Sequence, residues 1–342
     1  MAQSSWASGL AVERWAKELM YEVGKEIYFE KFMGSGPDSL IQVKNELNGQ
    51  SGDSVTFGLI TNLSGSGISG DSTLEGNEES MGNFSQTVST SMIRHAVRNT
   101  GRFDDSKVLY DFRVESLAVL KTWIAEYIDS QLFTNLVASC TYLFRADAGG
   151  DSVASRLSDD TDQLAAADLI VPADISALQK LAKVPGVSGQ LRIRPIRVGG
   201  REYYVLLVHP EVAYDLKQNS TFTQALREAE VRGSENPLFS GAIGIWDGVV
   251  IHEHENISLF DDGGGGAVHG AHNLFLGAQA GVYATVGDPI WVEKSFDYGN
   301  QLGVAGGLIF GNAKVKFDSD GDSSDEDFAV IRYSTASTDF SA

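Results

Sequence analysis

A long stretch between residues 106 and 140 constrains the fold of this chain more than any other sequence feature. Its apolar residues recur at steps of three and four, which is the period of a helix that buries one face. These residues are Leu117, Leu120, Ile124, Ile128, Leu132 and Leu136. No proline interrupts the stretch, and at about 1.5 Å of rise per residue the helix would be roughly 50 Å long. This length predicts a spine in an extended molecule, although an ordinary buried helix in a mixed domain would show the same pattern.

The start and the outward face of this helix are also predicted from residue type. Asp104, Asp105 and Ser106 belong to the residue types that favour a helix N-terminus. Charged residues in the stretch are expected on the face turned away from the core. They include Lys121, Glu126 and Asp129.

The composition is that of a folded and strongly acidic protein. Hydrophobic residues make up 42% of the 342 residues, which is enough for one or two domains. The 46 acidic residues outnumber the 26 basic ones and give a formal net charge of -20. Such a charge disfavours binding to nucleic-acid phosphates, but it is compatible with lying beside nucleic acid without adhering to it.

The single cysteine and the first residues of the chain disfavour disulfide-linked, thiolate-metal, secreted and membrane-spanning proteins. Cys140 is the only cysteine, so neither an intrachain disulfide nor a thiolate metal cluster is expected. We expect it to be a small apolar residue at the end of the spine helix. Residues 1–9 lack the pattern of a secretory signal, and no apolar run reaches the roughly 18 residues of a membrane span. We therefore expect a protein of cytosolic origin.

The N-terminal segment is predicted to be an arm. Residues 11–32 indicate an amphipathic helix, because apolar residues recur every four positions. These are Trp15, Leu19, Val23 and Ile27. The sequence GSGP at residues 34–37 ends the helix, so the segment is expected to pack on its own domain or on a neighbour.

A long acidic connection is predicted between two strands. Residues 53–63 and 84–98 alternate apolar and polar side chains, and the connection between them is rich in glycine and carboxylates. It far exceeds the usual hairpin length of about two to five residues, so we expect it to reach outside its own domain. Residues 65–70 match G-x-G-x-x-G, but they contain no lysine and precede carboxylates rather than a predicted helix. This pattern disfavours a phosphate-binding loop.

The second half of the chain predicts a compact α+β lobe, because strands alternate with short helices between residues 191 and 285. A helix over residues 174–183, with Asp174 as its N-cap, is expected just before it. Strands are expected at residues 191–198, 203–208, 249–251, 274–285 and 290–296, and helices at residues 211–218 and 222–231.

Two clusters could hold a metal ion. His252 and His254 follow a predicted strand and would share one face, where they could bind zinc with a third ligand. The alternative is a polar strand end at the surface of the lobe. Residues 318–327 form an acidic run that resembles the start of a calcium loop, but the glycine and the twelfth residue do not fit. A solvated loop is the better interpretation of this run.

Catalytic machinery finds no support in the sequence. No serine lies in a G-x-S-x-G elbow, and neither His95 nor His209 has a partner that would indicate a catalytic triad. The prediction is a chain with no catalytic residue, no cofactor and no metal.

Several stretches, in this order, carry a resemblance to a known family. They are GDSVTF at 52–57, DSTLEGNEE at 71–79, RHAVR at 94–98, VHP at 208–210, NPLFSGA at 236–242 and WDGVVIHEH at 246–254. Together they resemble the major capsid proteins of tailed bacteriophages, in particular a family that includes podovirus coats. None of these stretches is specific alone, but their combination is.

The resemblance implies the α+β fold of the Hong Kong 97-type capsid proteins. Its parts would be an N-terminal arm at 1–38, an extended loop (E-loop) region at 39–102, and a peripheral domain at 103–198 with the spine helix at 106–140. An axial domain at 199–285 would follow, and residues 286–342 would return to the peripheral domain and the C-terminus. His252 and His254 then fall inside a family motif without a known catalytic role.

The resemblance also implies the function and the partners. Copies of the chain would assemble through pentamers and hexamers into the icosahedral shell of a virion, within the host bacterial cytoplasm. A scaffolding protein, a portal and a decoration protein are the implied partners, and double-stranded DNA would be enclosed without specific binding. No membrane is implied. The E-loop would lie across a neighbouring subunit, with acidic residues facing basic ones. The candidates are Glu75, Glu78 and Glu79 on one copy and Arg94, Arg98 and Arg102 on the next.

Two other functions are compatible with parts of the sequence. The first is the shell of a cellular nanocompartment with the same fold, which would enclose enzyme cargo in place of a genome. The second is a metal-dependent hydrolase that uses His252 and His254.

Overall fold

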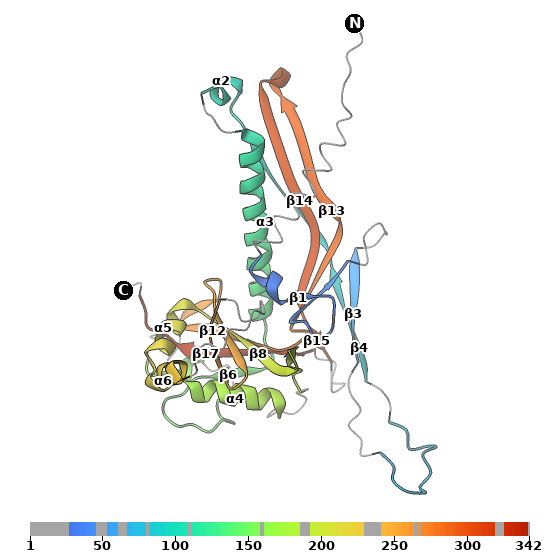
Figure 1. The fold of residues 1–342 in the computed structure, drawn as a ribbon, viewed down its shortest axis with the longest axis vertical. Coiled ribbons are helices and arrows are strands. Elements are labelled where there is room, and N and C mark those ends of the chain that lie inside the picture. The colour runs from blue at the N-terminus through green and yellow to red at the C-terminus, as the bar shows by residue number, and fades with distance from the viewer. Residues whose placement is uncertain are drawn as a thin grey trace.

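The computed structural model describes residues 27–45, 53–60, 67–79, 82–107, 111–157, 161–184, 192–228, 241–262, 266, 268–318 and 325–340. The molecule is extended: a long helix and a sheet of long strands run side by side away from a globular lobe (Figure 1). A separate two-stranded hairpin projects past the lobe on the other side of the sheet. Helices and sheets together give the predicted α+β class. Within these ranges, no helix is long and apolar enough to span a membrane.

The spine helix α3 spans Phe112–Val137 and has 26 residues, so it is about 39 Å long. It is shorter than predicted at both ends. The side chain of Asp111 caps it by accepting the N–H of Arg113 at 2.9 Å, whereas the predicted start residues lie in and beside a separate short helix, α2 (Arg102–Asp105). The helix ends where Ala138 adopts an extended backbone. The predicted apolar stripe is confirmed, because all six of its residues are buried.

The long sheet has five strands in the order β1-β2-β13-β14-β5. Their bounds are β1 Met33–Gly34, β2 Ile41–Lys44, β13 Gly281–Phe296, β14 Gln301–Lys314 and β5 Ser91–Arg98. Helix α3 packs along β14 and β5. The strand predicted at 274–285 is wrong as a single strand, because its start belongs to β12 (Val268–Leu276) in the other sheet and its end to β13. The strand predicted at 290–296 is the second part of β13, whose pairing register shifts between Val286 and Ile290.

Close strand approach in this sheet depends on glycine. A Cβ atom at Gly307 would lie 2.6 Å from the backbone oxygen of Ile93 on β5, which is shorter than any normal contact. Gly311 shows the same relation to the oxygen of Ser89, at 2.5 Å. Gly307 therefore lets the edge strand β5 pack tightly against β14, and Gly311 does the same for the chain at Ser89, just before β5.

The lobe is built on an eight-stranded sheet with the path β6-β17-β12-β8-β10-β9. The strands are β6 Leu143–Arg145, β7 Ile196–Val198, β8 Arg201–Val208, β9 Ala242–Trp246, β10 Val249–Glu253, β11 Leu259–Asp262, β12 Val268–Leu276 and β17 Val330–Ala336. The prediction of a central buried strand at 203–208 is confirmed, because β8 lies between β10 and β12 and residues 204–208 are all buried. Of the strand predicted at 191–198, the described residues form only the short strand β7.

Helices pack around this sheet. They are α4 Pro172–Lys183, α5 Pro210–Gln218 and α6 Ser220–Glu228. All three were predicted, although residues 229–231 lie outside the described ranges. Asp174 is not the N-cap of α4: Val171 holds that position, and Asp174 is buried in the first turn, where it pairs with Arg156 at 2.6 Å.

The projecting hairpin consists of β3 (Ser54–Ile60) and β4 (Asn83–Ser89). The single strand predicted over residues 84–98 is two strands in different sheets, because β4 pairs with β3 while β5 pairs with β14. The remaining short elements are η1 Tyr28–Phe32, η2 Thr161–Gln163, η4 Asp297–Gly299, β15 Lys316–Phe317 and β16 Glu326–Asp327. Only the last part of the predicted N-terminal helix is described, and it is the 3-10 helix η1.

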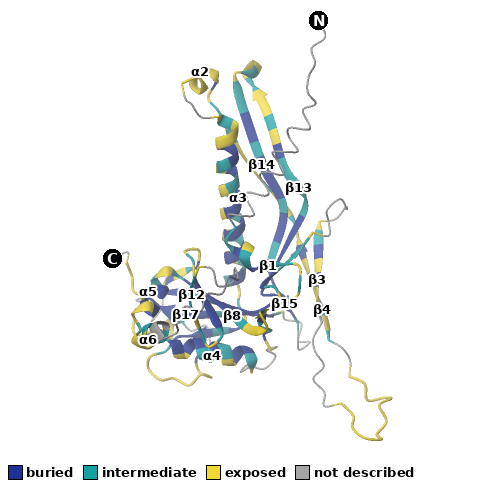
Figure 2. Ribbon diagram, in the orientation of Figure 1, coloured by how far each residue is buried: buried dark blue, intermediate teal, exposed yellow. Residues whose placement is uncertain are grey.

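The two sheets divide the chain differently from the predicted ranges. The boundary expected at residue 285 falls inside β13, which belongs entirely to the long sheet. In addition, β6 and α4 lie with the lobe although they precede residue 199, and the late strand β17 lies there as well (Figure 1). Buried residues concentrate in the lobe and where α3 faces the sheet, while the loop beyond β3 and β4 is exposed (Figure 2).

Candidate functional site

The tip of the loop between β3 and β4, residues 67–79, forms an ordered turn with exposed side chains. The backbone oxygen of Leu74 accepts the N–H of Asn77 at 3.0 Å, and the carboxylate of Glu78 accepts the N–H of Gly76 at 2.7 Å. Gly76 has a φ of +89°, which favours glycine. Leu74 is 63% exposed, so the tip presents an apolar side chain among carboxylates. The predicted contact residues here, all exposed, are Glu75, Glu78 and Glu79.

The glycine-rich motif does not precede a helix. Residues 65 and 66 lie outside the described ranges, and the next described element after the motif is strand β4. A phosphate-binding loop needs backbone amides at a helix N-terminus. Among the described residues between the motif and β4, this helix is not present.

The predicted basic residues lie on the long sheet and at its far end. Arg94 and Arg98 are exposed on β5, an outer strand of the sheet, and Arg102 begins α2. The guanidinium of Arg98 lies over the ring of Phe296, 4.1 Å from its centre, and donates to Gln301. These contacts hold the arginine against the sheet surface.

One subunit does not bring the acidic and basic candidates together. The tip of the loop between β3 and β4 and helix α2 lie at opposite ends of the molecule (Figure 1). The predicted pairing between Glu75, Glu78, Glu79 and the arginines is therefore impossible within one extended copy. It requires a second copy.

The far end of the long sheet exposes aromatic side chains that the sequence interpretation missed. Tyr298, in the turn between β13 and β14, is fully exposed, and Asp297 and Tyr298 both have a positive φ, of 48° and 50°. Asn300 closes the turn by donating its N–H to the oxygen of Asp297 at 2.9 Å. Phe103 on α2 is also exposed. The available sequence signal was the turn-forming run DYGN at residues 297–300.

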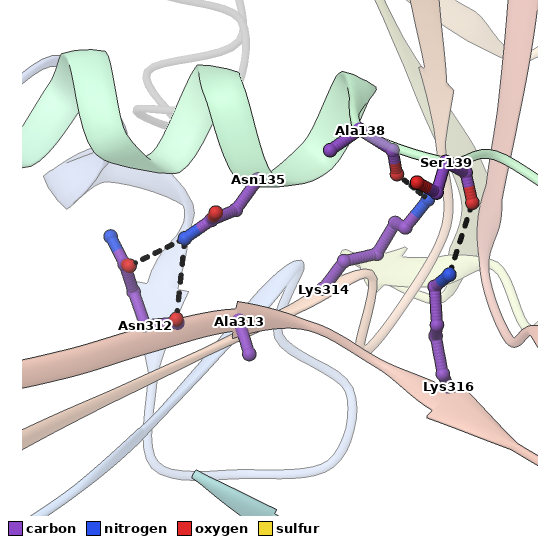
Figure 3. Close-up of a pocket in the computed structure, with 7 residues that line it drawn as sticks. All are labelled: Asn135, Ala138, Ser139, Asn312, Ala313, Lys314 and Lys316. Atoms are coloured by element: carbon purple, nitrogen blue, oxygen red, sulfur yellow. Dashed lines mark hydrogen bonds between the residues drawn. The ribbon is translucent and has the colours of Figure 1, made fainter. Parts of the chain in front are cut away.

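A polar pocket of about 220 Å³ lies where α3 ends against β14 and β15 (Figure 3). Lys314 donates to the backbone oxygen of Ala138 at 2.7 Å, and Lys316 donates to that of Ser139 at 3.0 Å. Asn135 donates to the side-chain oxygen of Asn312 at 2.7 Å. Cations at a helix C-terminus stabilise its terminal carbonyl groups. The pocket is therefore a joint between the spine and the sheet.

Cys140 and Asp327 complete this joint. The Cys140 sulfur lies 3.3 Å from the Lys314 ammonium, and burial raises the pKa of the thiol. Cys140 thus lies just past the spine helix, as predicted, but it contacts a charged group. The expectation that the acidic run is entirely solvated is wrong for Asp327, which is buried and pairs with Lys314 at 2.9 Å. Residues 319–324 of the run lie outside the described ranges.

His252 and His254 pack against aromatic rings. The ring of His252 lies 5.2 Å from that of Phe32, and the ring of His254 stacks on Phe133 at 4.6 Å and contacts Tyr28 at 4.2 Å. Burial lowers the pKa of His254. In the part of the chain that is described, no group of three or more metal-ligating side chains converges. The two histidines therefore join the lobe to the N-terminal segment and the spine.

The prediction that Asp129 lies on the outward face of the spine is wrong. Asp129 is 6% exposed, and its carboxylate accepts the backbone N–H of Tyr28 at 2.7 Å and that of Phe29 at 3.4 Å. Burial raises the pKa of this carboxyl to about 6, although the two hydrogen bonds oppose the shift. The sequence held a signal, because residue 129 lies three positions before Leu132 and therefore near the apolar stripe.

Comparisons with known proteins agree with this architecture. The sequence profile of a family described as phage capsid protein matches residues 3–339. The major capsid protein of Pseudomonas phage KPP25 is 32% identical over 351 residues, which cover 93% of this chain and 93% of that protein.

Solved capsid structures show the same fold. The capsid of Ralstonia phage GP4 matches with a TM-score of 0.77 and 28% identity, covering 99% of this chain and 96% of that one. The capsid of cyanophage Pam1 matches with a TM-score of 0.72 and 20% identity, covering 98% and 94%. The expected capsid fold is thus confirmed. The nearly full-length profile match and the 32% identical relative show that the chain belongs to the phage capsid protein family.

Proposed function

We propose that this chain is the major capsid protein from which a phage virion builds its shell. The observation that carries this proposal is the match to phage capsid proteins along nearly the entire chain. Identical subunits with heterologous contacts form closed assemblies when the contacts complete rings. We propose that the rings are pentamers and hexamers that tile an icosahedral shell around double-stranded DNA. The role is structural rather than enzymatic.

The extended shape supports the assignment of different structural roles to different parts of the subunit. We assign the long sheet and α3 to the peripheral domain and the eight-stranded lobe to the axial domain at the capsomer centre. Residues 1–38 would be the N-terminal arm, and the β3–β4 hairpin with its tip would be the E-loop. In this assignment the axial domain includes β6, α4 and β17, beyond the range of 199–285 expected from the sequence.

The E-loop is proposed to lie on a neighbouring copy. Its tip is exposed, acidic and ordered by its own hydrogen bonds, whereas the outer strand β5 of the long sheet carries exposed Arg94 and Arg98. The two surfaces have opposite charge and lie too far apart to meet within one copy. We propose that Glu75, Glu78 and Glu79 of one copy face Arg94, Arg98 and Arg102 of the next.

The energy of one such contact is small, but the shell repeats it at every subunit. An exposed ion pair contributes about 0–1 kcal/mol, and salt screens it further. The proposed contact therefore guides the register between neighbours more than it provides affinity. Leu74 would add apolar burial at the same contact.

Charge reversal tests this contact. A Glu78→Arg and Glu79→Arg double variant should assemble poorly, and adding Arg94→Glu and Arg98→Glu should restore part of the assembly. The matched control is Asp162→Arg, which reverses an exposed charge on the lobe. Normal assembly of the first double variant would contradict the contact without affecting the proposed shell function.

The acidic surface suits an enclosed but unbound genome. With a net charge of -20, the protein as a whole repels DNA phosphates and would release fewer counterions from DNA than a basic protein would. DNA could therefore move during packaging rather than adhere to the wall. A scaffolding protein, a portal and a decoration protein are further proposed partners, and assembly in the host bacterial cytoplasm is the proposed setting.

Electron microscopy and sedimentation of the purified full chain test the function itself. Uniform closed shells, tubes or ring-shaped capsomers are expected, and shells from infected cells should contain DNA. A monomer at every concentration, also when the scaffolding protein is present, would overturn the proposal. Shells that contain protein cargo in place of DNA would instead support a nanocompartment.

A further inference from the structure

The N-terminal segment enters the body through a joint of three parts. The short helix η1 lies against α3 (Figure 1), and its last residue, Phe32, contacts His252 of β10. Phe29 is fully buried and contacts Phe133 of the spine at 4.7 Å between ring centres, while Phe32 contacts His252 of the lobe at 5.2 Å. This joint connects the start of the described chain to both the spine and the lobe.

A carboxylate lies at the centre of this otherwise aromatic joint. Asp129 accepts the N–H groups of Tyr28 and Phe29, which open η1 and have no acceptor within that helix. A carboxylate is a favourable partner for the first amides of a helix. Asp129 and Phe133 are four positions apart and therefore share a face of α3, so one turn of the spine supplies both the acceptor and the ring.

Nothing in apolar packing requires an acid at this position. Burying a carboxylate costs free energy unless hydrogen bonds compensate for lost hydration. An apolar residue would fill the space but would leave two backbone N–H groups without their acceptor. The acid therefore fixes the orientation of the η1 backbone, which ring packing alone leaves adjustable.

We propose that Asp129 is the positioning residue of the N-terminal arm: it sets how the chain enters the body at Ile27, and its hold on the arm is weaker at neutral pH than in acid. The inference rests on the proposed assignment of residues 1–38 as an arm. The arm would carry its contacts to neighbouring copies from this fixed origin.

The direction of the pH effect follows from proton linkage. Burial, opposed by the two N–H contacts, raises the pKa of Asp129 from 3.8 to about 6. The docked state therefore holds its proton more tightly than a state with a solvated carboxyl. Its contribution to docking is fully present below about pH 4 and is lost as the pH rises through about 6. The other titratable groups at the joint are Tyr28, Lys31, His252, Glu253 and His254.

Hydrogen exchange of the full-length subunit tests the proposal. Protection factors, which correct for the intrinsic effect of pH, are measured for a peptide covering residues 27–33. Asp129→Leu should lower the protection at Tyr28 and Phe29 at least tenfold and should give malformed shells. Asp129→Asn keeps one oxygen acceptor, so it should retain most of the protection and lose its dependence on pH between about 4.5 and 7.5. Glu126→Leu, an exposed change on the same helix, should leave the protection unchanged.

The outcomes separate positioning from general stability. If Asp129→Leu fails to fold, the pH profile of Asp129→Asn decides alone. An Asn variant with the same pH profile as the natural chain would overturn the proposal, and so would a Leu variant with full protection or normal shells. If one of these results is obtained while the natural chain still forms intact shells, only the role of Asp129 is rejected. The proposed capsid function then stands.

Discussion

The ammonium group of Lys314 lies 2.9 Å from the carboxylate of Asp327, and the two side chains are 3% and 0% exposed. The ammonium also donates to the backbone oxygen of Ala138, and the carboxylate accepts the N–H of Thr141 at 2.9 Å. Burial raises the pKa of Asp327, while the charge of Lys314 opposes the shift. The pair thus connects the end of the spine, the end of β14 and the segment that leads into the lobe.

Replacing Lys314 by methionine is expected to destabilise the subunit by about 3–5 kcal/mol, because it leaves a buried carboxylate without its cation. Urea unfolding of the subunit measures this loss. The matched control is Lys107→Met, since Lys107 pairs with Asp104 at a similar 3.0 Å but both side chains are exposed. The control should cost about 0–1 kcal/mol. Equal effects of the two changes would contradict a special role for the buried pair.

A second buried network should respond to loss of one hydroxyl. The Tyr333 hydroxyl donates to Asp174 at 2.6 Å, and Asp174 also pairs with Arg156 at 2.6 Å. Tyr333→Phe removes one donor from a buried carboxylate, so we expect a loss of about 1–3 kcal/mol in thermal or urea unfolding. Tyr214→Phe, on an exposed tyrosine, is the control and should have little effect. An unchanged midpoint for Tyr333→Phe would show that the network contributes no stability.

Much of the fold could be predicted because its periodicities are strong and local. The stripe from Leu117 to Leu136 indicated the spine, and the apolar run at Tyr203–Val208 indicated the central strand of the lobe. Boundaries were less predictable, because they depend on contacts remote in sequence. Thr90 separates β4 from β5, for instance, where the chain leaves the hairpin and pairs with β14 instead.

The candidate contact residues stay predictions, and the charged joints were not predicted from the sequence. Asp129 and Asp327 looked like surface acids, since charge alone gives no sign of a partner. The two backbone N–H groups that Asp129 accepts lie about a hundred positions away in the sequence. The partner of Asp327 is Lys314, which lies on another strand. Which surfaces of two copies meet is likewise a property of the assembly and not of one chain.

His269 should make the stability of the lobe depend on pH. Burial lowers the pKa of His269, but hydrogen bonds and charges from Asp261 and Glu211 outweigh burial, so its pKa lies above the ordinary value. The stabilisation by the charged ring is therefore present below about pH 6.5 and is lost as the pH rises above that value. Thermal midpoints of the natural chain and of His269→Gln should differ in mild acid and converge in base. His95→Gln, on an exposed histidine, controls for loss of a ring, and a difference that grows with pH would contradict the assignment.

Gly307→Ala should weaken the edge of the long sheet. The added Cβ would lie 2.6 Å from the backbone oxygen of Ile93 and 2.8 Å from the Arg94 side chain, so β5 must move away from β14. Overpacking of this kind costs about 1–3 kcal/mol, which urea unfolding would detect. Gly36→Ala is the matched control, because a Cβ there meets nothing within 4 Å. Because β5 also carries Arg94 and Arg98, Gly307→Ala should lower the yield of shells as well, whereas Gly36→Ala should not. Unfolding midpoints and shell yields that stay equal for the two variants would show that β5 is held loosely and that its arginines need no fixed position.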